Sequence, residues 1–124
     1  MPRSIHPLRD DLREADFDVG TAMPRFDLPA DALSAANIAP ETRGADYLQF
    51  QTRVVAAFRA IVRAHREGTI LVVTHGGVIA TLLRSIFSGH QVSMYSDNTA
   101  LTMLQWRNAR WYLEFSNRRE HLVK

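Results

Sequence analysis

His75 is the residue whose surroundings most favour chemistry. It follows the apolar run 70–73 and comes directly before Gly76 and Gly77. The run has no polar alternation, so it predicts a strand over 70–74 that is buried on both faces. Apolar side chains at helical spacing follow the glycines and predict a helix over 77–88. His75 is therefore expected at the carboxyl end of a central strand, where open α/β sheets bind their ligands.

This combination of residues suits an anion. Glycines let the backbone N–H groups of a helix N-terminus approach a phosphate closely, and an imidazole can donate to it. We therefore predict a phosphate-binding site made by His75, Gly76 and Gly77. Asn98 can reach the mouth of this site, although an asparagine there also commonly caps a turn before a strand. The alternative is a buried core histidine before a tight strand–helix turn.

The remaining periodicity predicts the elements that position the site. Aromatic and aliphatic residues at three- and four-residue spacing predict an amphipathic helix over 46–66, with Asp46 as N-cap and Gly68 as stop. Alternating residues over 99–106 and 111–115, separated by a turn, predict a β-hairpin. The order helix–strand–helix–hairpin indicates an α/β domain.

Composition limits the classes of function. The chain has 124 residues, 46% of them hydrophobic, and a formal net charge of +2, which fits one domain with a sizeable core. Its basic residues are dispersed, so nucleic-acid binding is not indicated. Without cysteine there is no disulfide or Cys-ligated zinc, and no His or carboxylate pair has metal-ligand spacing, so we expect no metal and no cofactor. Neither a signal peptide nor a membrane span is visible, and a cytoplasmic location is expected.

The motifs in this order resemble the histidine phosphatase superfamily, which has the phosphoglycerate-mutase-like fold. The similarity covers nearly the whole chain. The segments that carry it are Leu12-Arg13-Glu14-Ala15-Asp16-Phe17, Gly44-Ala45-Asp46-Tyr47 with Phe50 and Arg53, Val72-Val73-Thr74-His75-Gly76-Gly77-Val78-Ile79, Asp97-Asn98-Thr99-Ala100-Leu101-Thr102, and Trp111 with Asn117 to Leu122.

The resemblance implies a fold. It is a three-layer α/β domain with a mostly parallel sheet, here a single partial domain over 1–124 that lacks the family's first strand and helix. Strand 70–74 is expected at its centre, with helices 46–66 and 77–88 packed on it and the hairpin extending the sheet.

The resemblance also implies a reaction and its missing parts. His75 inherits the role of the second histidine, which donates a hydrogen bond to the phosphoryl group. The family's nucleophile lies in an Arg-His-Gly motif, and this sequence has no Arg-His-Gly. The two family arginines are also absent, and the acid position of the motif Gly-Glu-Ser holds Ala45. Asp46, one residue on, is the candidate acid, whereas Glu14 matches a position that is usually structural.

Three interpretations remain open. The chain is the C-terminal portion of a phosphatase or phosphomutase acting on phosphomonoesters, inactive alone, whether as a fragment or through a late start. Alternatively, it is a degenerate member that binds a phosphorylated small molecule at His75 without catalysis. In the third interpretation it is an interaction module, because an unpaired strand edge invites a partner. That edge leads us to expect a homodimer. The substrate does not follow from the sequence.

Overall fold

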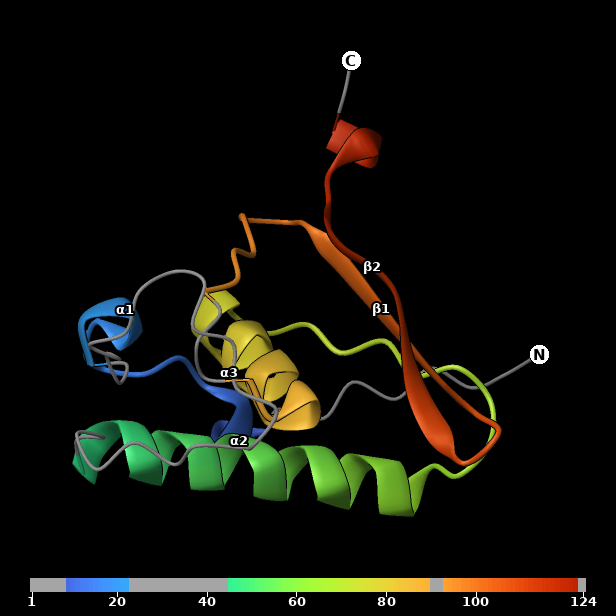
Figure 1. Cartoon of the computed structure of the whole chain (residues 1–124), viewed down its shortest axis with the longest axis horizontal. Helices are drawn as coiled ribbons and strands as arrows, with labels where there is room; N and C mark the ends of the chain where they lie inside the picture. The colour runs from blue at the N-terminus through green and yellow to red at the C-terminus, as the bar shows by residue number, and fades with distance from the viewer. Residues whose placement is uncertain (1–8, 23–44, 90–92, 123–124) are drawn as a thin grey trace.

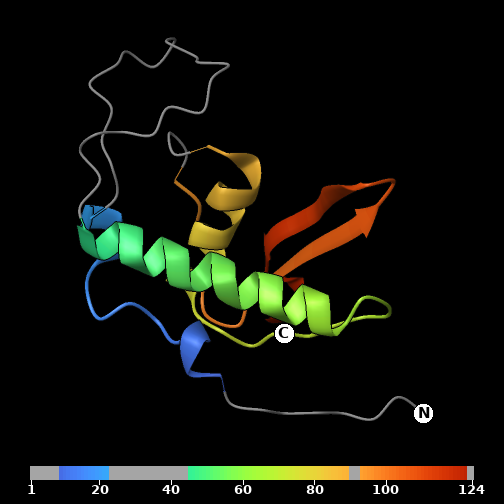
Figure 2. The same cartoon turned by 90° about the horizontal axis from the view of Figure 1, so that it is seen from below.

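The structure, a computed structural model, describes residues 9–22, 45–89 and 93–122 (Figure 1). In chain order its elements are the 3-10 helix η1 (Asp10–Leu12), α1 (Val19–Ala22), α2 (Ala45–Ala64), α3 (Gly76–Phe87), β1 (Leu101–Arg107), β2 (Arg110–Arg118) and the 3-10 helix η2 (Glu120–Leu122). Figures 1 and 2 show α3 and the β1–β2 hairpin on the same side of the long helix α2.

Helix α2 confirms the predicted amphipathic helix, with an end two residues earlier than expected. Its buried face recurs at the predicted spacing and consists of Tyr47, Phe50, Val54, Ala57 and Ile61. Asp46 is the second residue of the helix, so the prediction that it forms the N-cap is wrong. Its carboxylate still lies in the first turn, where the helix dipole favours negative charge. Gly68 follows in a bend with a φ of +91°, which glycine adopts at little cost.

Helix α3 confirms the second predicted helix, shifted by one residue. Val78 packs against Phe50 and Val54 of α2 and forms the central cluster of the core. The helix ends at Ser88, whose left-handed conformation (φ 55°) turns the chain so that the N–H of Gly89 also donates to the carbonyl oxygen of Arg84, at 3.0 Å. The two helices thus bury the apolar stripes that the sequence shows.

The predicted hairpin is also confirmed. β1 and β2 pair antiparallel, with Trp106 opposite Trp111. Asn108 and Ala109 between them both have positive φ, 53° and 60°, as a tight turn of the I′ kind requires. The Trp111 ring lies 5.3 Å from the ring of Phe58, between centroids, so the hairpin packs against the second half of α2.

The prediction of a central, buried strand over 70–74 is wrong for this structure. The segment is extended but pairs with no strand among the described residues, whose sheet is the two-stranded hairpin alone. Leu71 and Val73 are 80% and 87% exposed. The three-layer, mostly parallel sheet is therefore not present in the described ranges, and the hairpin forms a separate sheet rather than extending one. An apolar run is buried only when other elements cover it, and none of the described elements pairs with this run.

Within the described ranges, no helix combines the length and the apolarity that a membrane span needs.

Candidate functional site

The turn from Thr74 to Gly77 joins the extended segment to α3. His75 occupies the N-cap position with an extended backbone (φ −122°, ψ 159°), and its carbonyl oxygen accepts the N–H of Ile79 at 3.0 Å. His75 is exposed, and its imidazole makes no hydrogen bond with the described residues. His75 thus directly precedes the helix, as expected, but the strand at whose carboxyl end it was expected is not present in the described part of the chain. The buried core histidine, the alternative, is not what the structure shows.

A carboxylate lies at this helix N-terminus. Glu14 Oε2 accepts the backbone N–H of Gly77 at 3.0 Å, and Oε1 accepts the N–H of Ala15 at 3.1 Å. The positive end of the helix dipole favours a negative charge at this place. Sequence reasoning treated Glu14 as structural and missed it as a site residue. Its place in the Leu-x-Glu segment, together with the anion site expected at Gly77, could have pointed to Glu14. No local pattern links the two residues, because they lie 63 positions apart in the sequence.

Both glycines are explained by close neighbours. A Cβ on Gly76 would lie 2.9 Å from the carbonyl oxygen of Ser96, and a Cβ on Gly77 would collide with the Glu14 carboxylate. Neither contact leaves room for a larger residue without a shift. The glycines therefore permit the close approach of the Ser96 carbonyl and of the Glu14 carboxyl group, and the phosphate site predicted there stays a prediction.

The turn that contains Asn98 lies against Gly76 through Ser96. Asn98 is exposed and lies in the turn that leads into β1. The C-terminal residues hold the turn. Asn117 Oδ1 accepts the N–H of Asp97 at 2.9 Å, and Arg119 Nη1 lies 3.3 Å from Asp97 Oδ2. His121 Nε2 donates to the carbonyl oxygen of Thr99 at 2.7 Å, since a carbonyl only accepts.

Asp46, the candidate acid, is not joined to this turn by any contact in the described part of the chain. It is exposed in the first turn of α2 and makes neither a hydrogen bond nor an ion pair there. No group of three or more His, Asp and Glu side chains in the described ranges is arranged to hold a metal ion.

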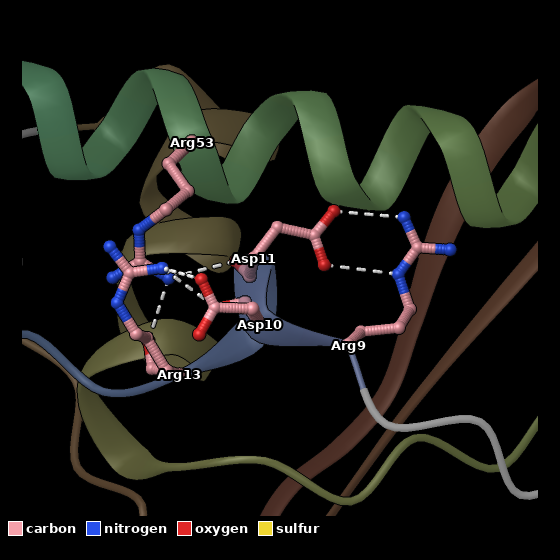
Figure 3. Close-up of polar contacts among 5 residues, drawn as sticks. All are labelled: Arg9, Asp10, Asp11, Arg13 and Arg53. Carbon is pink, nitrogen blue, oxygen red and sulfur yellow. Dashed lines mark hydrogen bonds and ion pairs between the residues drawn. The ribbon is translucent and has the colours of Figure 1, made fainter.

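The segment before Glu14 is fixed from two sides. Arg53 of α2 donates to the carbonyl oxygens of Asp11 and Arg13, and the hydroxyl of Thr74 donates to that of Leu12 (Figure 3 shows the Arg53 side). Burial lowers the pKa of the Arg53 guanidinium below its usual value, and the neighbouring positive charge of Arg13 adds to this effect. A partly buried guanidinium stays charged, and its charge strengthens the hydrogen bonds that it donates to carbonyl oxygens.

These features define an α/β protein in which an exposed histidine precedes a glycine-led helix and a carboxylate accepts a backbone N–H of the first turn of that helix. The chain belongs to the histidine phosphatase superfamily, branch 1, whose sequence profile matches residues 6–119. It is similar to the solved structure of Bacillus stearothermophilus YhfR, with 26% sequence identity and a TM-score of 0.55. The match covers 68% of this chain and 44% of YhfR, so the chain spans less than half the length of that relative. Comparison with curated proteins gives no match.

Proposed function

We propose that the turn at the start of α3 binds the phosphoryl group of a phosphomonoester, with His75 as the hydrogen-bond donor. The observation that carries this proposal is the exposed His75 imidazole beside Gly76 and Gly77 at a helix N-terminus. Membership of the superfamily supports a phosphorylated ligand. Asn98 lies on the neighbouring turn and is the further side chain that we assign to ligand binding.

Glu14 decides how a phosphate can enter. Its carboxylate already accepts the N–H of Gly77, and a phosphate dianion beside an ionised carboxylate is repelled. A ligand therefore takes the Gly77 amide only when the Glu14 side chain moves away from it. We therefore propose Glu14, rather than Asp46, as the carboxyl group of the site.

We further infer that these 124 residues bind phosphomonoesters without hydrolysing them. Covalent phosphoryl transfer needs a nucleophile in line with phosphorus and cations around the equatorial oxygens. The sequence offers no Arg-His-Gly motif, and His75 is the donor rather than the nucleophile in this proposal. Glu14 supplies one carboxyl group, which does not replace the covalent step.

Binding is tested by NMR titration with inorganic phosphate at millimolar concentration. The imidazole resonances of His75 should shift and saturate, because phosphate would bind next to the ring. His65, exposed beyond the end of α2, is the internal control and should shift far less. The His75→Ala variant should lose the saturable response of neighbouring amides. Equal, unsaturated shifts at both histidines would reject the site.

Turnover is tested with p-nitrophenyl phosphate on the pure chain. We expect no release of nitrophenol above the uncatalysed rate, since acid–base help alone is worth roughly two to four orders of magnitude and lacks a nucleophile to assist. Turnover that disappears in His75→Ala would reject the non-catalytic proposal and assign the nucleophile to His75. Turnover that persists in that variant would point to a contaminant.

A second candidate function, a protein-interaction module, is favoured by the exposed apolar segment 70–73. Ile70, Leu71, Val72 and Val73 are all exposed, and their segment contains neither a charged residue nor a proline to discourage edge pairing. We propose that a second copy of the chain covers it, by antiparallel pairing of the two identical segments. A two-fold axis would then pair apolar residues with apolar residues.

A further inference from the structure

We propose that Arg53 is a positioning residue of this site, because its grip on the chain just before Glu14 holds the Glu14 carboxylate on the Gly77 amide. The inference rests on the proposed function, since the place of Glu14 matters only if the start of α3 takes a ligand. Arg53 does not itself contact Glu14, His75 or Gly77 by a hydrogen bond. It acts through the backbone of η1 and the residues that follow.

Arg53 holds the backbone before Glu14 by specific hydrogen bonds. Arg53 Nη1 donates to two carbonyl oxygens, those of Asp11 and Arg13, at 2.8 Å each. The carbonyl between them, that of Leu12, accepts the Thr74 hydroxyl at 2.7 Å. Three consecutive carbonyls at the end of a short helix, where backbone acceptors lack helical partners, are thus all satisfied by side chains. Glu14 follows directly, so the start of its side chain has little freedom.

Arg53 itself is held by the core. Its guanidinium lies 4.9 Å from the centroid of the Phe50 ring, and Phe50 is buried one turn earlier on α2. Apolar packing of Leu12 and Ala15 against the core cluster brings the segment to the helices. Such packing is non-directional, whereas the two carbonyl bonds define where along α2 the segment sits. The place of Glu14 is therefore determined by a hydrogen-bonded contact over 40 residues of sequence.

The other ion pairs around η1 do not perform this task. Figure 3 shows Arg9 paired with Asp11 and Arg13 paired with Asp10, and both pairs stay within the exposed segment itself. They stiffen the turn without joining it to α2 or α3. Among the residues drawn there, Arg53 is the one that comes from a core helix.

Electrostatics support the same assignment. The carboxylates of Asp10, Asp11 and Glu14 act to raise the pKa of Arg53, against the larger effect of burial. The Glu14 charge is therefore close enough to be felt by the guanidinium. Lysine would keep the charge but lose the planar group that stacks on Phe50 and bridges two carbonyls, so Arg53→Lys is not a neutral exchange.

The backbone amide of Gly77 gives a direct measurement of the Glu14 position. Glu14→Ala defines its proton shift and its hydrogen-exchange rate when the carboxylate is absent. In Arg53→Met the amide should move most of the way to that reference. Its exchange should accelerate at least about tenfold, the change expected for losing a hydrogen bond to a charged group. Arg53→Lys should give an intermediate result. Arg59→Met, the same substitution at an exposed arginine of α2, is the matched control and should leave Gly77 unchanged.

Thr74→Val and Thr74→Ser test the second contact on the same stretch of backbone. The valine variant should shift the Gly77 amide in the same direction, and the serine variant should restore it, because only the hydroxyl donates. These milder variants keep the proposal testable if Arg53→Met does not fold.

Two results would overturn the proposal. An unchanged Gly77 amide in Arg53→Met means that packing alone holds Glu14. Equal acceleration at Gly77, Ala57 and Leu83 means that Arg53 only stabilises the core. The phosphate titration of His75 is read separately on the unaltered chain. A silent His75 rejects the proposed function, whereas the Gly77 amide still decides whether Arg53 positions Glu14.

Discussion

Helices α2 and α3 each carry an apolar face, and the segment 70–73 is apolar throughout, yet the helices bury their apolar residues and the segment exposes them. Tyr47, Phe50 and Val54 are almost completely buried between the helices, whereas Leu71 and Val73 lie mostly in solvent. The helices supply each other with a partner, and the extended segment has no strand beside it among the described residues. The comparison shows that an apolar pattern indicates which side chains gain from burial, whereas their actual burial depends on whether another element packs against them.

The largest expected difference in stability is between truncating a buried side chain of α2 and truncating an exposed side chain of the segment 70–73. Phe50→Ala removes a ring from the core cluster and should lower the free energy of unfolding by about 3–5 kcal/mol. Leu71→Ala removes a solvent-exposed side chain and should change it by about 0.5 kcal/mol or less. Urea unfolding followed by circular dichroism measures both. A large loss for Leu71→Ala would show that the segment is covered in solution.

The comparison also explains what could be predicted from the sequence. The spacing of Tyr47, Phe50 and Val54 predicts α2 because helical periodicity is a local property. The turn at Asn108 and Ala109 is local as well. In these elements each residue's neighbours along the chain already determine its conformation.

The site shows the limit of such reasoning. The start of a helix directly after His75 is a local feature, and the sequence predicts it, whereas the central strand expected before His75 is absent from the described residues. The contact between Glu14 and Gly77 and the grip of Arg53 on Asp11 and Arg13 join residues far apart in sequence. No periodicity encodes such pairs. The sequence predicts burial of the segment 70–73 wrongly for the same reason, since a run of apolar residues does not show which strand pairs with it.

A second effect concerns Arg84, a charged residue inside the helical half. It is 1% exposed, and it donates to the hydroxyls of Tyr47 and Thr81, at 3.2 and 3.3 Å. Arg84→Ala leaves these two buried hydroxyls without their donor and should cost about 1–3 kcal/mol of unfolding free energy. Arg59→Ala, at an exposed position of α2, is the control, with an expected change within about 0.5 kcal/mol. Equal effects would contradict the structural role of the buried guanidinium.

A third prediction tests whether a second copy of the chain covers the exposed segment 70–73. Sedimentation at micromolar concentration should show a dimer, and Val73→Lys should weaken it at least about tenfold, because a charge at a paired edge disfavours association. Leu48→Lys places the same charge on an exposed apolar position of α2 and should leave the dimer intact. A strictly monomeric chain, or equal weakening by both variants, would reject pairing through 70–73.

The smallest effect is the pH dependence of the exposed Arg9–Asp11 pair, which belongs to neither the core nor the uncovered segment. The hydrogen bond from Arg9 holds the pKa of the Asp11 carboxyl below its usual value of 3.8. A lowered folded-state pKa stabilises the fold above the usual value, and this contribution is lost as the pH falls through the folded-state pKa. Because the pair is solvent-exposed, Asp11→Asn should change the folding equilibrium constant by roughly twofold or less at pH 7. The difference from the unaltered chain should shrink as the pH falls below 3.8 towards the folded-state pKa, and it should also shrink in 1 M salt.

Arg9→Gln should cause the same small loss, and combining both substitutions should add nothing further, since each removes the same pair. A larger, salt-insensitive loss in Asp11→Asn alone would mean that the Asp11 side chain supports the Arg53 contact and so stabilises the packed part of the fold.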